Sequence, residues 1–163
     1  MSEPVLFRDP QGFKFGPRRV IGVRYEGDNK NGEIPALWEK VFMPRWQEIA
    51  VPECIQECYG VCRCLPGRPA GQFEYIAGKA AAADAPIPEG MLAVDIPESY
   101  YLSFETPLDQ IHAAWDFAMD WFAKHPEVEG FCTPLACECD THPCFEFYPP
   151  DFDGTLYLYF PIK

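Results

Sequence analysis

The sequence has no apolar run that approaches the roughly 18–20 residues needed to cross a bilayer. Its start, Met1-Ser2-Glu3-Pro4, lacks the basic and then apolar regions of a secretory signal peptide. We therefore expect a soluble, cytoplasmic protein without a membrane partner. With 163 residues, 48% of them hydrophobic, the chain can form one packed core or two small modules that share one.

Positive charge is scarce: 13 Lys and Arg stand against 25 Asp and Glu, for a formal net charge of −12. Nucleic-acid binding depends on cationic side chains that neutralise phosphates, so the balance argues against direct contact with DNA or RNA. It is compatible with cationic small molecules and with a basic protein surface as a partner. The chain also lacks a Ser/His/Asp constellation and a nucleophile elbow, so any catalysis would depend on a carboxylate and phenols.

Cysteine, in contrast, is plentiful. The eight cysteines form two clusters, Cys54, Cys58, Cys62 and Cys64 in the first and Cys132, Cys137, Cys139 and Cys144 in the second. Their spacings are C-x-C and C-x-x-x-C, whereas structural zinc sites usually use paired C-x-x-C chelates. A structural metal in either cluster is one interpretation, and thiols that pack as small hydrophobic groups are the other. We predict no metal site and no cofactor.

The most informative stretch is residues 143–150, which alternates as a β-strand does. Phe145 and Phe147 should point to one face, and Cys144, Glu146 and Tyr148 to the other. An acidic residue within an aromatic strand is costly to bury unless it is paired or has a function. Glu146 is therefore either a solvated side chain on a half-exposed strand or a carboxylate at the floor of an aromatic pocket.

The rest of the chain alternates strands with two helices. We expect strands over residues 1–17 (extended lead-in), 19–25, 59–65, 72–77, 91–96, 100–105 and 155–162. A helix should begin at Ile34 with Pro35 in its first turn, and Pro44 should kink or restart it near Met43. A second helix should begin with Thr106 as its cap and end at His125-Pro126.

The two halves of the chain repeat one pattern: a strand, a helix with two tryptophans, a cysteine-containing loop and two strands. Module one covers about residues 1–78, an Ala/Pro-rich linker covers 79–90, and module two covers about 91–163. The pairing of halves makes Gly60 the counterpart of Glu146. Two such units related by a pseudo-twofold axis would leave a groove between them, with a Gly on one side and a Glu on the other.

Five short motifs occur in an order that resembles the GyrI-like small-molecule-binding domain, which is also the effector-binding domain of some bacterial transcription activators and multidrug regulators. They are Ile34-Pro35-Ala36-Leu37-Trp38, Tyr59-Gly60-Val61, Phe73-Glu74-Tyr75-Ile76-Ala77-Gly78, Phe145-Glu146-Phe147-Tyr148-Pro149 and Tyr159-Phe160-Pro161-Ile162. The resemblance covers nearly the whole chain. It implies a single α+β domain of two strand–helix–strand–strand modules, with a mostly antiparallel sheet and a ligand groove between the halves.

The resemblance also implies the site. The buried Glu of the family maps onto Glu146, and Tyr75, Tyr148, Tyr157 and Tyr159 are candidates for the aromatic residues of the groove. The chain has no room for the helix-turn-helix domain of the family's regulators, so we expect a stand-alone binding protein for hydrophobic, cationic or planar ligands. One alternative is a hydrolase of strained cyclopropane rings with Glu146 as general base; another is an acidic protein-interaction module. The sequence does not predict the oligomeric state.

Overall fold

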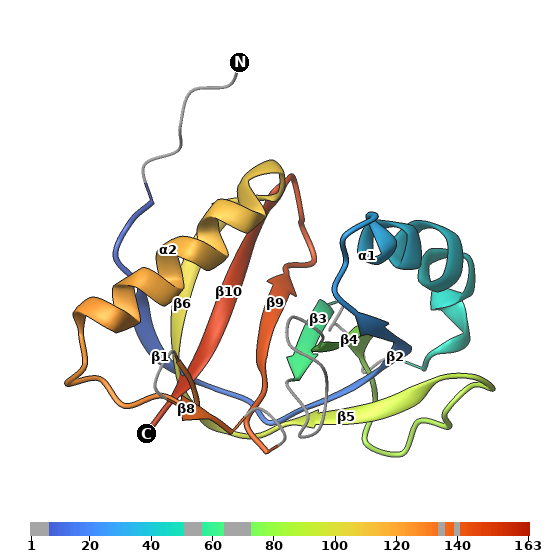
Figure 1. Ribbon diagram of the computed structural model, residues 1–163. Helices are drawn as coiled ribbons and strands as arrows, with labels where there is room; N and C mark the ends of the chain where they lie inside the picture. The colour runs from blue at the N-terminus through green and yellow to red at the C-terminus, as the bar shows by residue number, and fades with distance from the viewer. Residues whose placement is uncertain (1–6, 51–56, 64–72, 134–135, 139–140) are drawn as a thin grey trace.

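The structure is a computed structural model that describes residues 7–50, 57–63, 73–133, 136–138 and 141–163. Two helical segments lie on the same side of a curled antiparallel sheet (Figure 1), which confirms the predicted α+β class. The eight strands of this sheet are β1 (Gln11–Phe15), β2 (Arg18–Gly27), β3 (Cys58–Arg63), β4 (Phe73–Ala80), β5 (Leu92–Ile96), β6 (Ser99–Pro107), β9 (Cys144–Tyr148) and β10 (Thr155–Ile162). A separate hairpin joins β7 (Cys132–Thr133) to β8 (Ala136–Cys137).

The order of strands across the sheet brings the two halves of the chain together at β3 and β9. The order is β1-β6-β10-β9-β3-β4-β2-β5. The three strands β6, β10 and β9 on one side of the centre therefore match β2, β4 and β3 on the other. Two strand–helix–strand–strand units joined edge to edge would give this order, but the duplication itself stays a prediction. The outermost strands cross over, since β1 pairs with β6 and β5 pairs with β2.

The first helical segment changes its winding where the sequence predicted an interruption. It consists of α1 (Glu33–Ala36), a π-helical segment η1 (Leu37–Phe42) and a 3₁₀ segment η2 (Met43–Glu48). Pro44 has no backbone N–H to continue the earlier hydrogen-bonding pattern, and the winding tightens at Met43. The apolar side chains of this segment that pack on the sheet are Ile34, Leu37, Trp38, Phe42 and Trp46.

The second helical segment begins later than predicted. A short 3₁₀ turn, η3 (Leu108–Gln110), leads into α2 (Ile111–Lys124), which ends at His125 as expected. The prediction that Thr106 caps this helix is wrong. Thr106 belongs to β6, pairs with Leu156 of β10, and its hydroxyl donates to the Pro107 carbonyl over 2.8 Å. Sheet pairing continues to Pro107, so the Thr106 hydroxyl is used before the helix begins.

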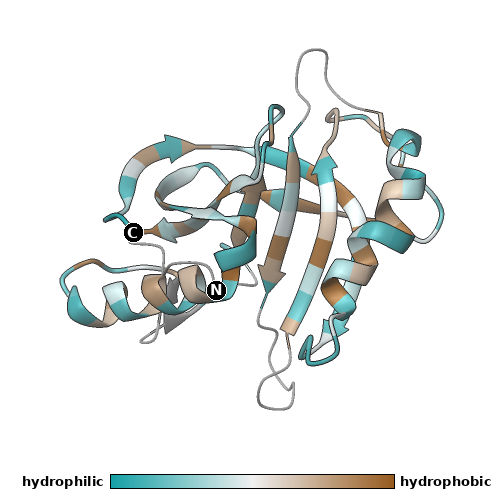
Figure 2. Cartoon of the chain, turned by 90° about the horizontal axis from the view of Figure 1, so that it is seen from above, coloured by the Kyte–Doolittle hydropathy of each residue, from teal (hydrophilic) through white to brown (hydrophobic). Residues whose placement is uncertain are grey.

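Side chains alternate between two faces of the sheet, as the hydropathy colouring in Figure 2 shows along the strands. The face covered by the helices, here the helix face, carries two clusters: α2 packs on β6 and β10, and the first helical segment packs on β2 and β4. The other face, here the open face, carries a third cluster that includes no helix residue among those described. Tyr59, Tyr101, Phe145 and Phe160, all completely buried, show how thoroughly both faces are packed.

Strand β4 runs further than the sequence indicated. Lys79 and Ala80, at the start of the expected linker, still pair with Cys58 and Val20 in the neighbouring strands. Residues 81–90 then lie outside the helices and strands. Within the described residues, no helix combines the length and the apolar character that a bilayer crossing needs.

Replacement of Phe160 by Ala should test the core beneath α2. Phe160 is fully buried, and its ring centroid lies 5.3 Å from Trp115 and 5.5 Å from Phe122. The cavity left behind should lower the free energy of unfolding by about 3–5 kcal/mol. Urea denaturation followed by tryptophan fluorescence would measure this. Phe152→Ala is the control, because Phe152 is 40% exposed and its loss should cost far less; equal costs would contradict this account of the core.

Candidate functional site

The candidate site is centred on the contact between β3 and β9, where Gly60 lies directly opposite Glu146. Directly opposed residues of antiparallel strands share a face, so the Glu146 side chain lies beside a position without a side chain. A Cβ atom built on Gly60 would come within 2.5 Å of Glu146 Oε1 and 2.0 Å of the Tyr75 hydroxyl. Glycine at position 60 therefore leaves the space in which the carboxylate and the phenol meet.

Glu146 is buried and is held by phenols. Only 6% of the residue is exposed. The hydroxyls of Tyr75 and Tyr148 both donate to Oε1, over 2.6 and 2.9 Å. Tyr75 comes from β4 on the far side of β3, and Tyr148 from β9 itself. The structure thus brings together three of the five residues that the sequence proposed for the site.

Two tryptophans, one from each helical segment, complete what we call the Glu146 network: Glu146, Tyr75, Tyr148, Trp38 and Trp115. Trp38 Nε1 donates to the Tyr75 hydroxyl over 2.8 Å, and the ring centroids of Trp38 and Tyr148 lie 5.3 Å apart. Trp115 also lies near enough to Glu146 to lower the pKa of its carboxyl group. The sequence predictions missed both tryptophans as site residues. Their matching places in the two repeated halves were the signal that could have found them.

Burial and hydrogen bonding act on the Glu146 pKa in opposite directions. Burial raises the pKa because it removes water from the carboxylate, and this effect is the largest. Hydrogen bonds from Tyr75, Tyr148 and Trp115 favour the ionised form and lower it, but the net shift is upward. The pKa values of Tyr75 and Tyr148 are also raised, first by burial and then by the nearby Glu146 charge. Both phenols therefore keep their protons at neutral pH and act as donors.

A second buried acid shows what the Glu146 network lacks. Glu74, 1% exposed, forms ion pairs with Arg24 and Arg63. Among the residues that the structure describes, Glu146 has no such cationic partner; its hydrogen bonds there come from Tyr75 and Tyr148. A buried carboxylate without a counterion is costly, so the Glu146 network is suited to a positive charge that the described part of the chain does not supply.

The other two candidate residues, Tyr157 and Tyr159, lie on the opposite side of the sheet. On β10 they pair with Phe147 and Phe145, while Leu158 is the residue opposite Glu146. Tyr157 and Tyr159 consequently pack in the open-face cluster, where the Tyr159 ring lies 5.3 Å from that of Phe147. The sequence pattern had put both tyrosines on one face of the strand. It could not show that the face is the one turned away from Glu146.

The cysteines give no support to a metal centre in the described part of the chain. Cys58 is a free thiol, and Cys62 lies opposite Cys144 between β3 and β9. Within the described residues, no group of three or more His, Cys, Asp and Glu side chains is arranged to hold a metal ion. The side chains of the remaining cysteines, Cys54, Cys64, Cys132, Cys137 and Cys139, lie outside the described part.

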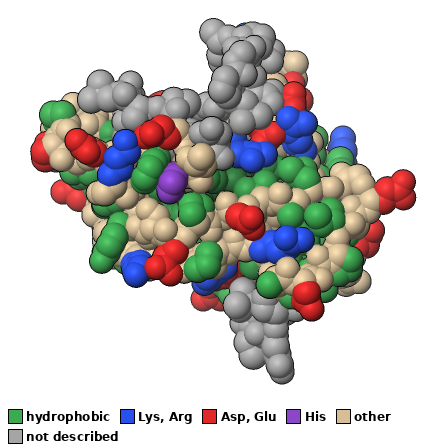
Figure 3. Space-filling view, turned by 90° about the horizontal axis from the view of Figure 1, so that it is seen from below, with side chains coloured by type: hydrophobic (Ala, Val, Ile, Leu, Met, Phe, Trp, Pro, Cys, Tyr) green, Lys and Arg blue, Asp and Glu red, His purple; other side chains and the backbone are tan. Residues whose placement is uncertain are grey.

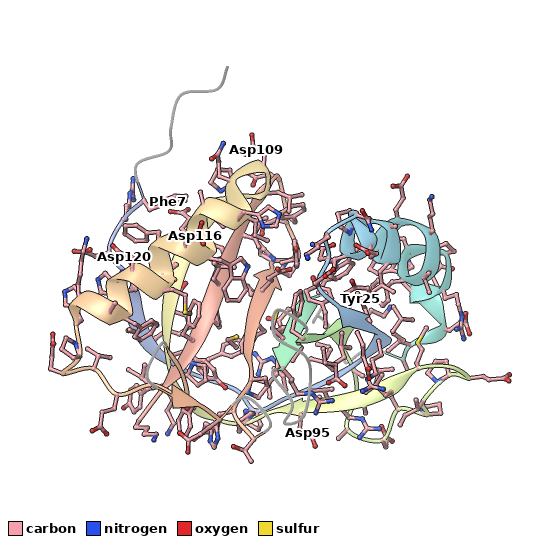
Figure 4. The ribbon with its side chains drawn as sticks, viewed as in Figure 1. Phe7, Tyr25, Asp95, Asp109, Asp116 and Asp120 are labelled. Atoms are coloured by element: carbon pink, nitrogen blue, oxygen red, sulfur yellow. The ribbon has the colours of Figure 1, made fainter. Side chains whose placement is uncertain are left out.

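The exposed charges are not gathered at the Glu146 network. Asp109, Asp116 and Asp120 lie along the helical segment that contains α2 and are solvent-exposed (Figure 4). The view from below shows acidic, basic and hydrophobic side chains interspersed (Figure 3). An acidic interaction surface therefore stays a prediction, with α2 as one place where exposed aspartates recur.

Replacement of Gly60 by Ala should disturb the network directly. The added Cβ would overlap the Tyr75 hydroxyl and the Glu146 carboxylate, so we expect the free energy of unfolding to fall by about 1–3 kcal/mol. Gly12→Ala is the matched strand control, because its Cβ would meet only Leu102 at 3.4 Å. Urea titrations of the three proteins would measure the difference. A Gly60→Ala variant as stable as Gly12→Ala would show that Glu146 does not lie over Gly60.

The raised pKa of Glu146 predicts a pH dependence of stability. Between the unfolded value near 4.5 and the higher folded value, the folded protein holds a proton that the unfolded chain releases. The contribution of Glu146 to stability should therefore be greatest at low pH and should fall as the pH rises through the folded pKa.

A Glu146→Gln variant isolates this contribution. The free energies of unfolding of both proteins are measured from pH 4 to pH 8, and the value of the variant is subtracted from that of the wild type. This difference should decrease as the pH rises. A difference that is flat or moves the other way would contradict the direction of the shift.

Comparison with known proteins agrees with this architecture. The family model described as "Integron-associated effector binding protein" (Cass2) matches residues 16–162. A curated relative, the transcriptional regulator BrlR of Pseudomonas aeruginosa, is 36% identical over 85 residues, which are 52% of this chain and 30% of that protein. The matched region thus spans less than a third of the relative's length.

Solved structures share the fold at low sequence identity. An integron cassette protein from the mobile metagenome of Vibrio cholerae has a TM-score of 0.66 at 17% identity, covering 96% of this chain and 97% of its own. SAV2435 bound to tetraphenylphosphonium has a TM-score of 0.67 at 11% identity, covering 96% and 94%. EcmrR in a DNA complex has a TM-score of 0.65 at 13% identity, and 58% of that chain is covered. The chain has the GyrI-like fold, and it belongs to the family of integron-associated effector binding proteins.

Proposed function

We propose that this protein binds hydrophobic small molecules that carry a positive charge, and that Glu146 supplies the countercharge. The observation that carries the proposal is a 6% exposed carboxylate whose contacts among the described residues are hydrogen bonds from aromatic side chains. An ion pair is much stronger in such surroundings than in water, because the local dielectric constant is low. Glu74, on the same strand as Tyr75, is a buried acid that ion pairs with Arg24 and Arg63 neutralise, so it needs no charge from a ligand.

The aromatic members of the Glu146 network suit the same ligand class. Tyr75 and Tyr148 contact the carboxylate, and Trp38 contacts both of these tyrosines. The faces of such rings attract cations, and their area stabilises flat apolar groups. A cation with aromatic substituents could use the carboxylate for its charge and the rings for its apolar surface. A neutral or anionic ligand would use only part of these contacts.

The comparisons support this proposal from outside the chain. SAV2435, which shares the fold, is bound to tetraphenylphosphonium, a lipophilic cation. BrlR is a transcriptional regulator and EcmrR is seen in a complex with DNA. We propose that this chain corresponds to the effector-binding part of such proteins and that its own function is recognition of the small molecule.

The geometry supports binding better than the hydrolase alternative. General-base hydrolysis would use Glu146 to activate water and a phenol to polarise the substrate carbonyl. Both nearby phenols, Tyr75 and Tyr148, donate their hydrogens to Glu146 itself. A hydrolytic activity therefore stays a prediction that requires these hydrogen bonds to rearrange.

Isothermal titration with tetraphenylphosphonium would test the role of Glu146. Glu146→Gln keeps the shape and removes the charge, so the binding free energy should weaken by about 2–5 kcal/mol. Triphenylphosphine oxide, which has similar rings and no net charge, should bind the wild type weakly and should lose little in the variant.

A Tyr157→Phe variant is the control for the sheet face. Tyr157 packs on the open face, so removal of its hydroxyl should leave tetraphenylphosphonium binding unchanged. Unaltered affinity in Glu146→Gln, or an equal loss in Tyr157→Phe, would show that the cation is not recognised by the Glu146 network.

A further inference from the structure

Lys79 is a buried lysine on the helix face of β4. It is 6% exposed, lies opposite Cys58 of β3, and its Nζ is placed over the Trp46 ring, 4.4 Å from the centroid. Trp46 belongs to η2, so the lysine stem is enclosed between the sheet and the first helical segment. Few lysines in proteins are buried to this degree unless an acid accompanies them.

The other five lysines of the chain provide the comparison. Four have a carboxylate partner: Lys14 pairs with Glu98, Lys30 with Asp28, Lys124 with Asp120 and Lys163 with Glu138. The fifth, Lys40, has no such partner among the described residues but is exposed to water. Lys79 is thus the lysine that is both buried and without a carboxylate partner in the described part of the chain.

Two features of the surroundings act on Lys79 in opposite directions: the Trp46 face stabilises the ammonium ion, and burial favours the neutral amine. Burial lowers its pKa because the ammonium ion loses hydration, and the neighbouring Cys58 opposes this only in part. The same burial raises the pKa of Cys58 to about 11, which keeps that thiol protonated at neutral pH. The Lys79 amine and the Cys58 thiol are the two potential nucleophiles in this row of the sheet. The amine is the one whose pKa shift increases the fraction in the reactive form.

The amine nitrogen is not completely enclosed. Among the described residues, Arg19 Nε is the one fully enclosed side-chain polar atom that lacks a hydrogen-bond partner. Lys79 Nζ has no hydrogen-bond partner among those residues either, so it is not fully enclosed. The indole of Trp46 lies against the nitrogen, so a small electrophile would have to reach it from another side.

We propose that Lys79 is a covalent capture site for small aldehydes. The neutral Nζ attacks the carbonyl carbon, the adduct loses one water molecule, and a C=N bond replaces the C=O bond. The protonated imine is again a cation, and the face of Trp46 at the distance seen for Nζ would stabilise it. The step needs no oxidant or reductant. The proposal concerns β4 and η2 and does not rest on cation binding by Glu146.

Reductive alkylation can measure the reactivity of every lysine at once. The full chain is treated at pH 7 with limiting propanal and cyanoborohydride, folded and in urea, and peptide mass spectrometry gives the rate at each lysine. We expect Lys79 to react about threefold faster, or more, in the folded protein than in urea, because a lowered pKa increases the neutral-amine fraction. Lys40, exposed and unpaired, should react at similar rates in both.

Two variants identify the reacting atom. Lys79→Arg keeps a positive charge but cannot form an imine, so the rapid adduct should disappear, whereas Cys58→Ser should retain it. The proposal is overturned if folded Lys79 reacts no faster than Lys40 or than Lys79 in urea. It is equally overturned if the adduct survives in Lys79→Arg or is lost in Cys58→Ser. The reaction rates of the individual lysines in the wild-type chain decide the question even where a variant fails to fold.

Discussion

The antiparallel pairing of β3 with β9 is the constraint on which the site depends. It sets Gly60 opposite Glu146, and the missing side chain at position 60 gives room for a carboxylate and for the Tyr75 hydroxyl that reaches it from β4. A shift of one residue in this register would turn Glu146 to the open face and replace it with an aromatic ring. The hydrophobic residues on both faces oppose such a shift, so the packing of the whole sheet holds the carboxylate in place.

The two most deeply buried acids among the described residues, Glu74 and Glu146, are stabilised in different ways. Glu74 is neutralised by Arg24 and Arg63, and the resulting cluster needs nothing from outside. Glu146 is held by hydrogen bonds from neutral donors, which orient the carboxylate without supplying a positive charge. Desolvation then works against the ionised form, and a cationic ligand would offset that cost.

The helix face concentrates the unusual chemistry of this chain. Across β9, β3 and β4, one row holds Tyr148, Cys58 and Lys79, and the next holds Glu146, Gly60 and Ala77. Both helical segments cover this face, and each contributes a tryptophan to the Glu146 network. The open face carries an aromatic cluster whose ion pairs, such as Arg18 with Glu57, are satisfied within the chain. Both faces of the sheet are packed, and the Glu146 network lies on the face that the helices cover.

The sequence by itself determined the α+β class, most of the strands, the break near Met43 and the face that Glu146 shares with Tyr148. These follow from alternation, helical spacing and proline, which act over a few residues. Tertiary structure alone decided that Gly60 faces Glu146, that Tyr75 and the two tryptophans join it, and that Tyr157 and Tyr159 point away. The order and register of strands distant in sequence fix those contacts, and no local pattern records them. The same holds for Thr106, which pairs with Leu156 of β10 instead of capping the helix, and for Lys79, whose burial without a carboxylate partner among the described residues depends on a helix more than thirty residues away.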